Sequence, residues 1–460
     1  MEAQPQTRRN GGSPVQPKPI AVFNRTRGVL GYSLPEFPNY IEIPSGRWTI
    51  EDASKQQFPR AFVYNHLAKD KNVSVQFPYA RWMANDDKHL TIASPIDTVT
   101  GFGKMSINLI AALDKLRDDL MLFPTAYWHY EGTPTRVQEM MSAPHIPTKW
   151  TLAITIPPEL EKIPSRNIIL FTMWETLQIP EGWGEIVNKY CKALVLPTEN
   201  QIEIWKSAGV TVPIFVCPLG IDPHIYAYQE RPARGDKPFT ILMYGFLSGR
   251  KSPLETWTDV VWRAFGSDDF GAPVDDWKMI IKTRRKVVGA GMPVEFNDPH
   301  VEFISGDFYE SEMAELCYRS DVGIMLSHFE GWGLPMREMM ATGLPTIVSD
   351  NSGHSVDCDP VICYPVPNEN ELELAGDQYS TEKEKRYWYI PDYGAAARML
   401  RQEYDDWKTR GKTQSDMGTR AAEYIHQNRT WDMCAVTLND IINAVMSNHA
   451  LLTHNGIVVK

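Results

Sequence analysis

Glu330 and Glu338, separated by seven residues, enclose the turn Gly-Trp-Gly-Leu-Pro at 331–335. Carboxylates accept hydrogen bonds and therefore suit the hydroxyl groups of a sugar. The backbone amides at the start of a helix have no partner inside it and favour a phosphate. Pro335 fits the first turn of such a helix, because its φ is fixed and its missing N–H is not needed there. The segment therefore predicts a site for a sugar joined to a diphosphate.

The surrounding residues predict a strand, a loop, a helix and a second strand. Val322 to Leu326 and Thr346 to Val348 are short apolar runs, which are typical of buried parallel strands. Gly343 and Pro345 end the helix that lies between them. This arrangement brings the two carboxylates and the free amides to the same space.

The segment resembles the signature of retaining glycosyltransferases of the GT-B type, glycosyltransferase family 4, also described as glycosyl transferases group 1. The resemblance implies an α/β fold in which two Rossmann-like domains face each other across a cleft. It also implies that Glu330 is catalytic and contacts hydroxyls of the donor sugar, and that Glu338 binds the ribose of the nucleotide. The expected donor contacts of the turn are Gly331, Gly333 and Leu334.

From about Lys88 onward, strands alternate with helices, which predicts parallel βαβ units. Residues 218–222 (Pro-Leu-Gly-Ile-Asp) resemble the hinge between the two domains of this family. The expected divisions are a disordered polar tail (1–20), an N-terminal extension (21–87), an acceptor-side Rossmann-like domain (88–220), a nucleotide-sugar donor domain (221–427) and a C-terminal helix that crosses back to the first domain (428–460).

Arg250 and Lys251 follow the first predicted strand of the second domain, Phe239 to Met243. They resemble the catalytic diphosphate clamp of the family, in which two cations neutralise the charge that grows on the leaving group. One common family pattern has Arg directly after the glycine, where this chain has Phe246, so Arg250 is expected to replace it. The alternative is a solvated helix N-terminus. A helix dipole disfavours cations at its N-terminus, so two cations at this position favour a role in ligand binding.

Two features of the first domain are further candidates. Gly101 and Gly103 are predicted to form a turn before a helix from Lys104 to Leu116. They resemble the glycine loop of the family, where the backbone can approach the donor closely, or they form a plain turn between a strand and a helix. Glu175 follows a predicted strand, where many relatives have His. There it can act catalytically by orienting the acceptor or stabilising positive charge, or it can be a structural residue at a strand end.

The remaining donor-binding candidates are Thr198 and Lys282. Thr198 resembles a family element whose hydroxyl faces the donor phosphate. Lys282 begins the basic run 282–286, which can edge the donor cleft, contact an anionic acceptor, or form a solvated loop. Asp357 and Asp359 have the spacing of a metal-binding pair, but they do not directly follow a strand. We expect no metal and no cofactor beyond the nucleotide-diphosphate sugar as co-substrate.

Composition excludes some classes of protein. The net charge is −11, so no global basic field attracts nucleic acid or anionic membranes. No apolar run is long enough for a transmembrane helix, and the N-terminus lacks the apolar stretch of a signal peptide. The six cysteines are scattered, as is typical of reduced thiols. We therefore expect a cytoplasmic protein.

The leading hypothesis is a retaining glycosyltransferase, a hexosyl- or pentosyltransferase, that moves a sugar from a nucleotide-diphosphate sugar to an acceptor hydroxyl. The acceptor stays open: a sugar, protein, lipid or nucleic acid. One alternative is a non-catalytic GT-B protein that binds sugar nucleotides or acts as a scaffold, favoured by Phe246 and the absent His. A second is a two-carboxylate glycoside hydrolase, although a hydrolase has no pyrophosphate for the cations to hold.

Overall fold

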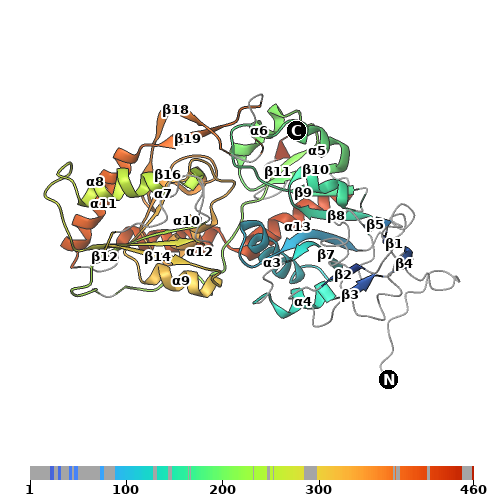
Figure 1. The fold of residues 1–460 in the computed structure, drawn as a ribbon, viewed down its shortest axis with the longest axis horizontal. Coiled ribbons are helices and arrows are strands. Elements are labelled where there is room, and N and C mark those ends of the chain that lie inside the picture. The colour runs from blue at the N-terminus through green and yellow to red at the C-terminus, as the bar shows by residue number, and fades with distance from the viewer. Residues whose placement is uncertain are drawn as a thin grey trace, which may run out of the picture.

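The computed structural model describes residues 89–447 apart from 128–131, 143–147, 164, 166, 232, 246–248, 252, 284–297, 377–378, 380–383 and 412–414. It also describes the backbone of short strands near the two ends of the chain. The predicted tail 1–20, Phe246 and residues 284–286 lie outside the described residues. The described chain forms two lobes side by side, each built around a parallel sheet with helices on its faces (Figure 1).

The first lobe contains a sheet with the strand order β20-β11-β10-β9-β8-β6-β7, in which only β20 pairs antiparallel. The strands are β6 (Leu90–Ile96), β7 (Leu120–Tyr127), β8 (Trp150–Ile154), β9 (Asn167–Phe171), β10 (Cys191–Leu196), β11 (Ile214–Val216) and β20 (Val458–Val459). The helical segments are α3 (Gly101–Asp114), α4 (Thr135–Ser142), η3 (Pro157–Lys162), α5 (Trp183–Tyr190), η4 (Glu199–Gln201) and α6 (Ile202–Ser207).

The second lobe contains a fully parallel sheet with the order β14-β13-β12-β15-β16-β17. Its strands are β12 (Phe239–Tyr244), β13 (Trp277–Thr283), β14 (Val301–Ser305), β15 (Val322–Met325), β16 (Thr346–Ser349) and β17 (Tyr364–Val366). The helical segments are η5 (Gly249–Lys251), α7 (Pro253–Glu255), η6 (Thr256–Val261), α8 (Trp262–Phe265), α9 (Glu310–Tyr318), α10 (Leu334–Ala341), η7 (Ser355–Asp357), α11 (Tyr393–Thr409) and α12 (Asp416–Asn428).

Three small β units complete the fold. An antiparallel hairpin, β18 (Asn368–Leu374) and β19 (Tyr387–Pro391), extends from the second lobe. Near the N-terminus, β1 (Ala21–Asn24), β4 (Gly46–Thr49) and β5 (Val73–Gln76) form one sheet, and β2 (Leu30–Tyr32) pairs with β3 (Ile41–Ile43).

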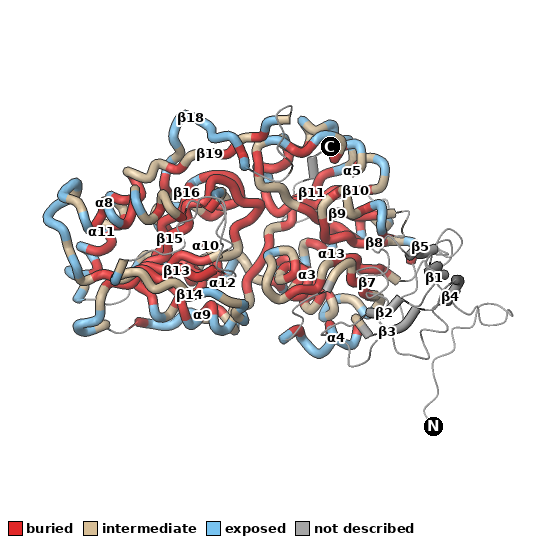
Figure 2. Tube along the Cα trace, in the orientation of Figure 1, coloured by how far each residue is buried: buried red, intermediate tan, exposed pale blue. Residues whose placement is uncertain are grey.

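Apolar strands hold each lobe together. Every residue of β12 is buried, and so is every residue of β15 and β16. Parallel strands covered by helices on both faces lose water from both sides, which explains their continuous apolar sequence. Figure 2 shows this burial along the middle of both sheets and at the junction of the lobes.

The chain passes between the lobes twice, at adjacent places. The amide of Ile221 donates to the carbonyl of Arg429 at 2.9 Å, and the amide of Trp431 donates back to Ile221 at 3.3 Å. After this crossing, α13 (Trp431–Ser447) packs against α3 of the first lobe, and its buried residues include Leu438, Ile441 and Ile442. Helix α13, which follows the second lobe in the sequence, therefore contributes to the core of the first lobe.

The predicted turn at residues 101–103 was wrong. Helix α3 already begins at Gly101, because Thr100 caps it and accepts a hydrogen bond from the amide of Gly103 at 3.1 Å. A Cβ at Gly103 would lie 2.0 Å from the carbonyl oxygen of Asp97. This glycine allows close packing within the first lobe.

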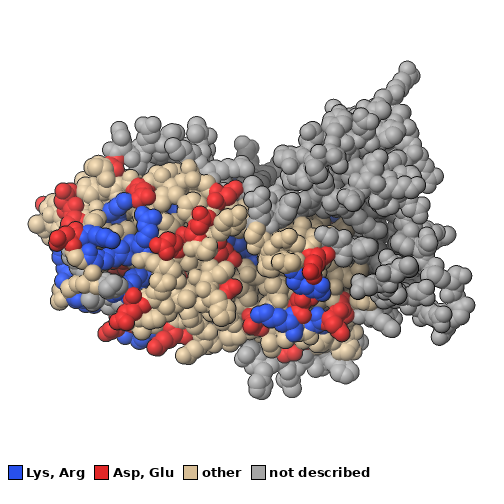
Figure 3. Space-filling model, turned by 90° about the horizontal axis from the view of Figure 1, so that it is seen from below, with Lys and Arg blue, Asp and Glu red and all other residues tan. Residues whose placement is uncertain are grey.

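The surface carries both signs of charge. On the face drawn in Figure 3, basic side chains lie among acidic ones. In the structure as a whole, Lys278 and Arg319 both form ion pairs with Glu302. Among the helices that the structure describes, none combines the length and apolar character required to cross a membrane.

The crossing predicts a stability effect for Gly220→Ala. A Cβ at Gly220 would lie 2.2 Å from the backbone of Thr430 and Trp431, so the two crossing segments must separate. We expect a loss of about 1–3 kcal/mol, measured by calorimetric unfolding. Gly376→Ala is the matched control, because no atom of the described residues lies within 4 Å of its Cβ position. Equal transition temperatures for the two variants would contradict the tight crossing.

Candidate active site

A cavity of about 680 Å³ lies between the two lobes. Its walls come from the carboxyl ends of β12 and β13, from η5 and from the turn that leads into α10. The first lobe contributes the start of α3 and the loops after β8 and β9. Open parallel sheets bind ligands at the carboxyl ends of their strands, and a cavity of this size suits a small-molecule ligand.

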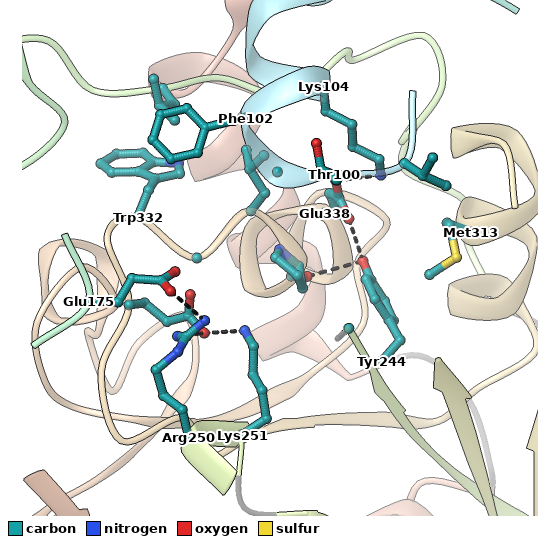
Figure 4. A pocket seen from close by; sticks show the side chains of 18 of the residues that line it. Thr100, Phe102, Lys104, Glu175, Tyr244, Arg250, Lys251, Met313, Trp332 and Glu338 are labelled. Atoms are coloured by element: carbon teal, nitrogen blue, oxygen red, sulfur yellow. Dashed lines mark hydrogen bonds and ion pairs between the residues drawn. The ribbon is translucent and has the colours of Figure 1, made fainter. Parts of the chain in front are cut away.

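Two cations and two carboxylates meet at one end of the cavity (Figure 4). Arg250 pairs with Glu330 through Nη1 at 2.9 Å and with Glu175 through Nη2 at 2.9 Å. Lys251 also pairs with Glu330. Glu175 belongs to the first lobe and the other three residues to the second, so this charge cluster joins the lobes.

The charges set the protonation of the two carboxylates. Burial alone would raise the pKa of Glu330, but the positive charges of Arg250 and Lys251 outweigh it and hold the pKa well below the ordinary range. Desolvation by the cavity walls raises the pKa of Glu175 despite Arg250, although 45% of this side chain is exposed. Glu330 is therefore ionised at neutral pH, and the cations balance its charge.

A second polar cluster lies at the other end, around Glu338 (Figure 4). The hydroxyl of Tyr244 donates to Glu338 at 2.7 Å, and the ammonium group of Lys104 lies 3.5 Å from the same carboxylate. Lys104 comes from α3 of the first lobe and also lies 4.0 Å from Glu310. Burial lowers the pKa of Lys104, but these two carboxylates reverse the effect and raise it.

The turn between the two clusters is closely packed. Gly333 precedes α10 with φ of 88°, a left-handed conformation, and a Cβ there would lie 2.3 Å from the ring of His354. Pro335 lies in the first turn of α10. The buried guanidinium of Arg337 holds the turn from behind, because it donates to the carbonyls of Trp332 and Gly333.

Asp357, one of the two candidate metal ligands of the sequence, takes part in internal ion pairs. Its carboxylate pairs with Arg337 at 2.5 Å and with Arg429 at 2.8 Å, and these charges lower its pKa although burial opposes them. Among the described residues, no group of three His, Cys, Asp or Glu side chains is placed to hold a metal ion.

Comparisons with known proteins agree with this geometry. Residues 296–358, which include Glu330 and Glu338, match the family described as glycosyl transferases group 1. Many solved structures share the fold of the chain, among them those of three different proteins. They are HepE of Anabaena in complex with UDP and glucose (12% identity, 77% of this chain and 100% of that chain, TM-score 0.53), sucrose-phosphate synthase of Thermosynechococcus elongatus (14%, 78% and 100%, 0.52), and a glycosyltransferase of Rickettsia africae (12%, 78% and 99%, 0.53). No curated protein sequence matches significantly.

The family match contains the two glutamates of the site, and the shared fold is GT-B. The chain therefore has the GT-B fold, and its segment 296–358 matches the family of glycosyl transferases group 1. The predicted fold class is thereby confirmed. The comparisons give no support to the glycoside hydrolase that the sequence left open.

The structure brings most of the predicted site residues into one cavity. The predicted residues that line it are Glu330, Arg250, Lys251, Glu175, Glu338, Gly333, Leu334, Gly101 and Lys282. Lys282 is buried, donates to the carbonyl of Gly306 at 2.7 Å and lies over the ring of Phe308. Burial lowers its pKa. It stands at the edge of the cavity, as one of the sequence interpretations expected.

Three predicted residues do not line the cavity. Gly331 lies behind it, where a Cβ would meet Met173 at 2.6 Å, and its carbonyl accepts from Gln201 at 2.8 Å. Gly103 packs on Asp97 within the first lobe. Thr198 is buried after β10, and its hydroxyl finds no hydrogen-bond partner among the described residues. The two glycines are required by internal packing.

Sequence reasoning missed Tyr244 and Lys104 as site residues. Tyr244 ends β12, and the carboxyl end of a strand was a signal that could have found it. Lys104 lies in the first turn of α3, but the wrong turn prediction hid its place. Its contact with Glu338 spans 234 residues of sequence, and no local pattern reveals such a pairing.

His354 predicts a pH dependence of stability. Burial lowers its pKa to about 3, whereas an unfolded His has a pKa of about 6.5. The unfolded state therefore binds the proton first, and stability falls as the pH drops below 6.5. The expected loss from this residue between pH 6.5 and 4.5 is about 2 kcal/mol. Urea unfolding of the wild type and of His354→Asn at both pH values measures it, and parallel pH dependences would contradict the assignment.

Proposed function

We propose that this protein is a glycosyltransferase that moves a hexose or pentose from a nucleoside-diphosphate sugar to an acceptor hydroxyl, with retention of the anomeric configuration. The observation that carries the proposal is the arrangement within one cavity. A carboxylate–tyrosine cluster stands at one end, two cations at the other, and a helix N-terminus lies between them.

Each part suits one part of such a donor. Glu338 accepts hydrogen bonds from the ribose hydroxyls, beside Tyr244. The amide end of α10, at Gly333 and Leu334, faces the diphosphate, and Arg250 and Lys251 add positive charge. Glu330 accepts from hydroxyls of the transferred sugar. The HepE structure holds UDP and glucose, which makes uridine diphosphate sugars the first donors to test.

The reaction forms a bond between the acceptor oxygen and the anomeric carbon and breaks the bond from that carbon to the phosphate oxygen. In the proposal, the proton of the acceptor hydroxyl goes to the departing phosphate oxygen. The products are a glycoside and a nucleoside diphosphate. Glu330 is ionised but paired with two cations, and Glu175 pairs with Arg250, so neither carboxylate is a free nucleophile. Attack from the side of the leaving group gives retention.

The same cations support catalysis without a metal, because they neutralise the charge that develops on the diphosphate. No cofactor is needed beyond the donor. We place the reaction in the cytoplasm on the basis of the sequence. The acceptor class stays open among sugars, proteins, lipids and nucleic acids.

Removal of the two cations should abolish recognition of the diphosphate. Arg250→Ala with Lys251→Ala leaves Glu330 and Glu175 unbalanced in the cavity, where they repel a diphosphate. Charge-assisted hydrogen bonds contribute roughly 1.5–3 kcal/mol each, so affinity for UDP should fall at least about 100-fold. Affinity for uridine should stay within a few fold. Calorimetry with a panel of nucleoside diphosphates and nucleosides measures both.

The matched control is Lys278→Ala with Arg319→Ala. This variant also removes one lysine and one arginine, but from ion pairs with Glu302 at the surface. This variant should bind like the wild type. An unchanged preference for the diphosphate after loss of Arg250 and Lys251 would move the diphosphate site elsewhere.

Transfer should continue after exhaustive chelation. The measurement is release of nucleoside diphosphate from a panel of nucleoside-diphosphate sugars, with candidate acceptors, before and after chelation. We expect the rates to agree within about twofold, because side chains supply the positive charge. Complete loss of activity, restored by manganese or magnesium, would contradict the metal-independent mechanism.

A further inference from the structure

The hairpin β18–β19 has no place in the function described so far. It extends along the top of the second lobe toward the first (Figure 1). There it meets the loop after β9, which carries Glu175. The amide of Leu177 donates to the carbonyl of Tyr387 at 3.1 Å, and the amide of Tyr387 donates to the side chain of Gln178 at 2.8 Å. The hairpin and this loop are therefore joined across the lobes.

Trp388 of β19 contacts the backbone of Glu175, a residue that lines the cavity. Its indole Nε1–H donates to the backbone carbonyl of Glu175 at 2.8 Å, and only 7% of the residue is exposed. The ring packs in one buried cluster with Phe329 and Ala375. It also meets the ring of His328 edge-on, with 6.0 Å between the ring centres.

The neighbours of the Trp388 ring, His328 and Phe329, form hydrogen bonds with Arg250. The carbonyl of Phe329 accepts from the guanidinium of Arg250, and the amide of His328 donates to the carbonyl of Arg250 at 2.8 Å. Trp388 therefore contacts the backbone of Glu175 on one side and the segment that holds Arg250 on the other. Glu175 and Arg250 form the 2.9 Å ion pair between the lobes.

We infer that Trp388 is a positioning residue for the Glu175–Arg250 pair, and that the hairpin fixes this pair at the reacting end of the cavity. The inference rests on the proposed function, which places Glu175 and Arg250 beside the donor. The side chain of Glu175 is 45% exposed and, among the described residues, forms an ion pair only with Arg250, so its backbone anchor determines where the carboxylate stands. A catalytic group that is displaced by about 1 Å loses much of its effect.

Trp388→Phe tests the inference. The phenyl ring keeps the packing on Phe329, but the indole N–H is lost and the carbonyl of Glu175 loses its donor. Trp277→Phe is the matched control. Trp277 is 6% exposed, and its Nε1–H also donates to a backbone carbonyl, that of Val274 at 3.2 Å. It begins β13, whereas the cavity lies at the carboxyl end of that strand.

The first measurement is hydrogen exchange of the full chain, followed by mass spectrometry of peptides over 174–181. In Trp388→Phe, this segment should exchange about tenfold faster, because the Leu177 amide loses the fixed hairpin. In Trp277→Phe, it should exchange as in the wild type. Equal exchange in the wild type and Trp388→Phe would overturn the inference, whatever donor the enzyme uses.

The second measurement is turnover with the donor that the sugar-nucleotide panel identifies. Trp388→Phe should lower kcat about tenfold and change the donor KM by no more than a few fold. In a Glu175→Gln background, it should cost nothing further, because Trp388 acts through Glu175. A further loss in that background would overturn the inference. If the wild type transfers no sugar from any donor, the proposed function fails, and the exchange measurement still decides whether Trp388 holds the Glu175 loop.

Discussion

The ion pairs that Glu330 makes with Arg250 and Lys251 are the constraint on which the rest of the site depends. A single buried charge is costly, and removal of one partner of such a pair is strongly destabilising. In this site two cations from η5 meet Glu330 on the loop after β15, and Glu175 of the first lobe balances the remaining charge. The cavity can therefore keep four ionisable groups at its reacting end, with no net charge among them. A diphosphate that enters must compete with the carboxylates for these cations.

The cavity forms where the two lobes pack against each other. Trp332, on the turn of the second lobe, is 1% exposed and belongs to the buried core of the first. The guanidinium of Arg337 lies 3.6 Å from the centre of its ring. Lys104 reaches from α3 to Glu338, and α13 crosses back to pack on α3. Contacts at both ends of the cavity thus make its shape depend on the relative position of the lobes.

Local signals predicted the part of the site that lies within one stretch of chain. Gly333 and Pro335 start α10, and Gly343 follows its end with φ of 80°. Such turn and cap residues act through their neighbours, so a sequence reveals them. The start of α3 depended on the cap at Thr100, which the glycines around it concealed. The pairing of Lys104 with Glu338 and the hairpin contact of Trp388 join distant segments. These two contacts depend on how the lobes pack against each other, which no periodic sequence pattern reveals.

The stereochemistry of transfer tests the proposed mechanism most directly. If the paired carboxylates are not nucleophiles or bases, the leaving phosphate takes the acceptor proton and the sugar keeps its anomeric configuration. Proton NMR of the first product formed from an α-linked donor sugar gives the answer through the coupling of the anomeric proton. We predict an α-linked product. A β-linked product would show attack from the opposite face with a free carboxylate as base, and would contradict the roles proposed for Glu330, Arg250 and Lys251.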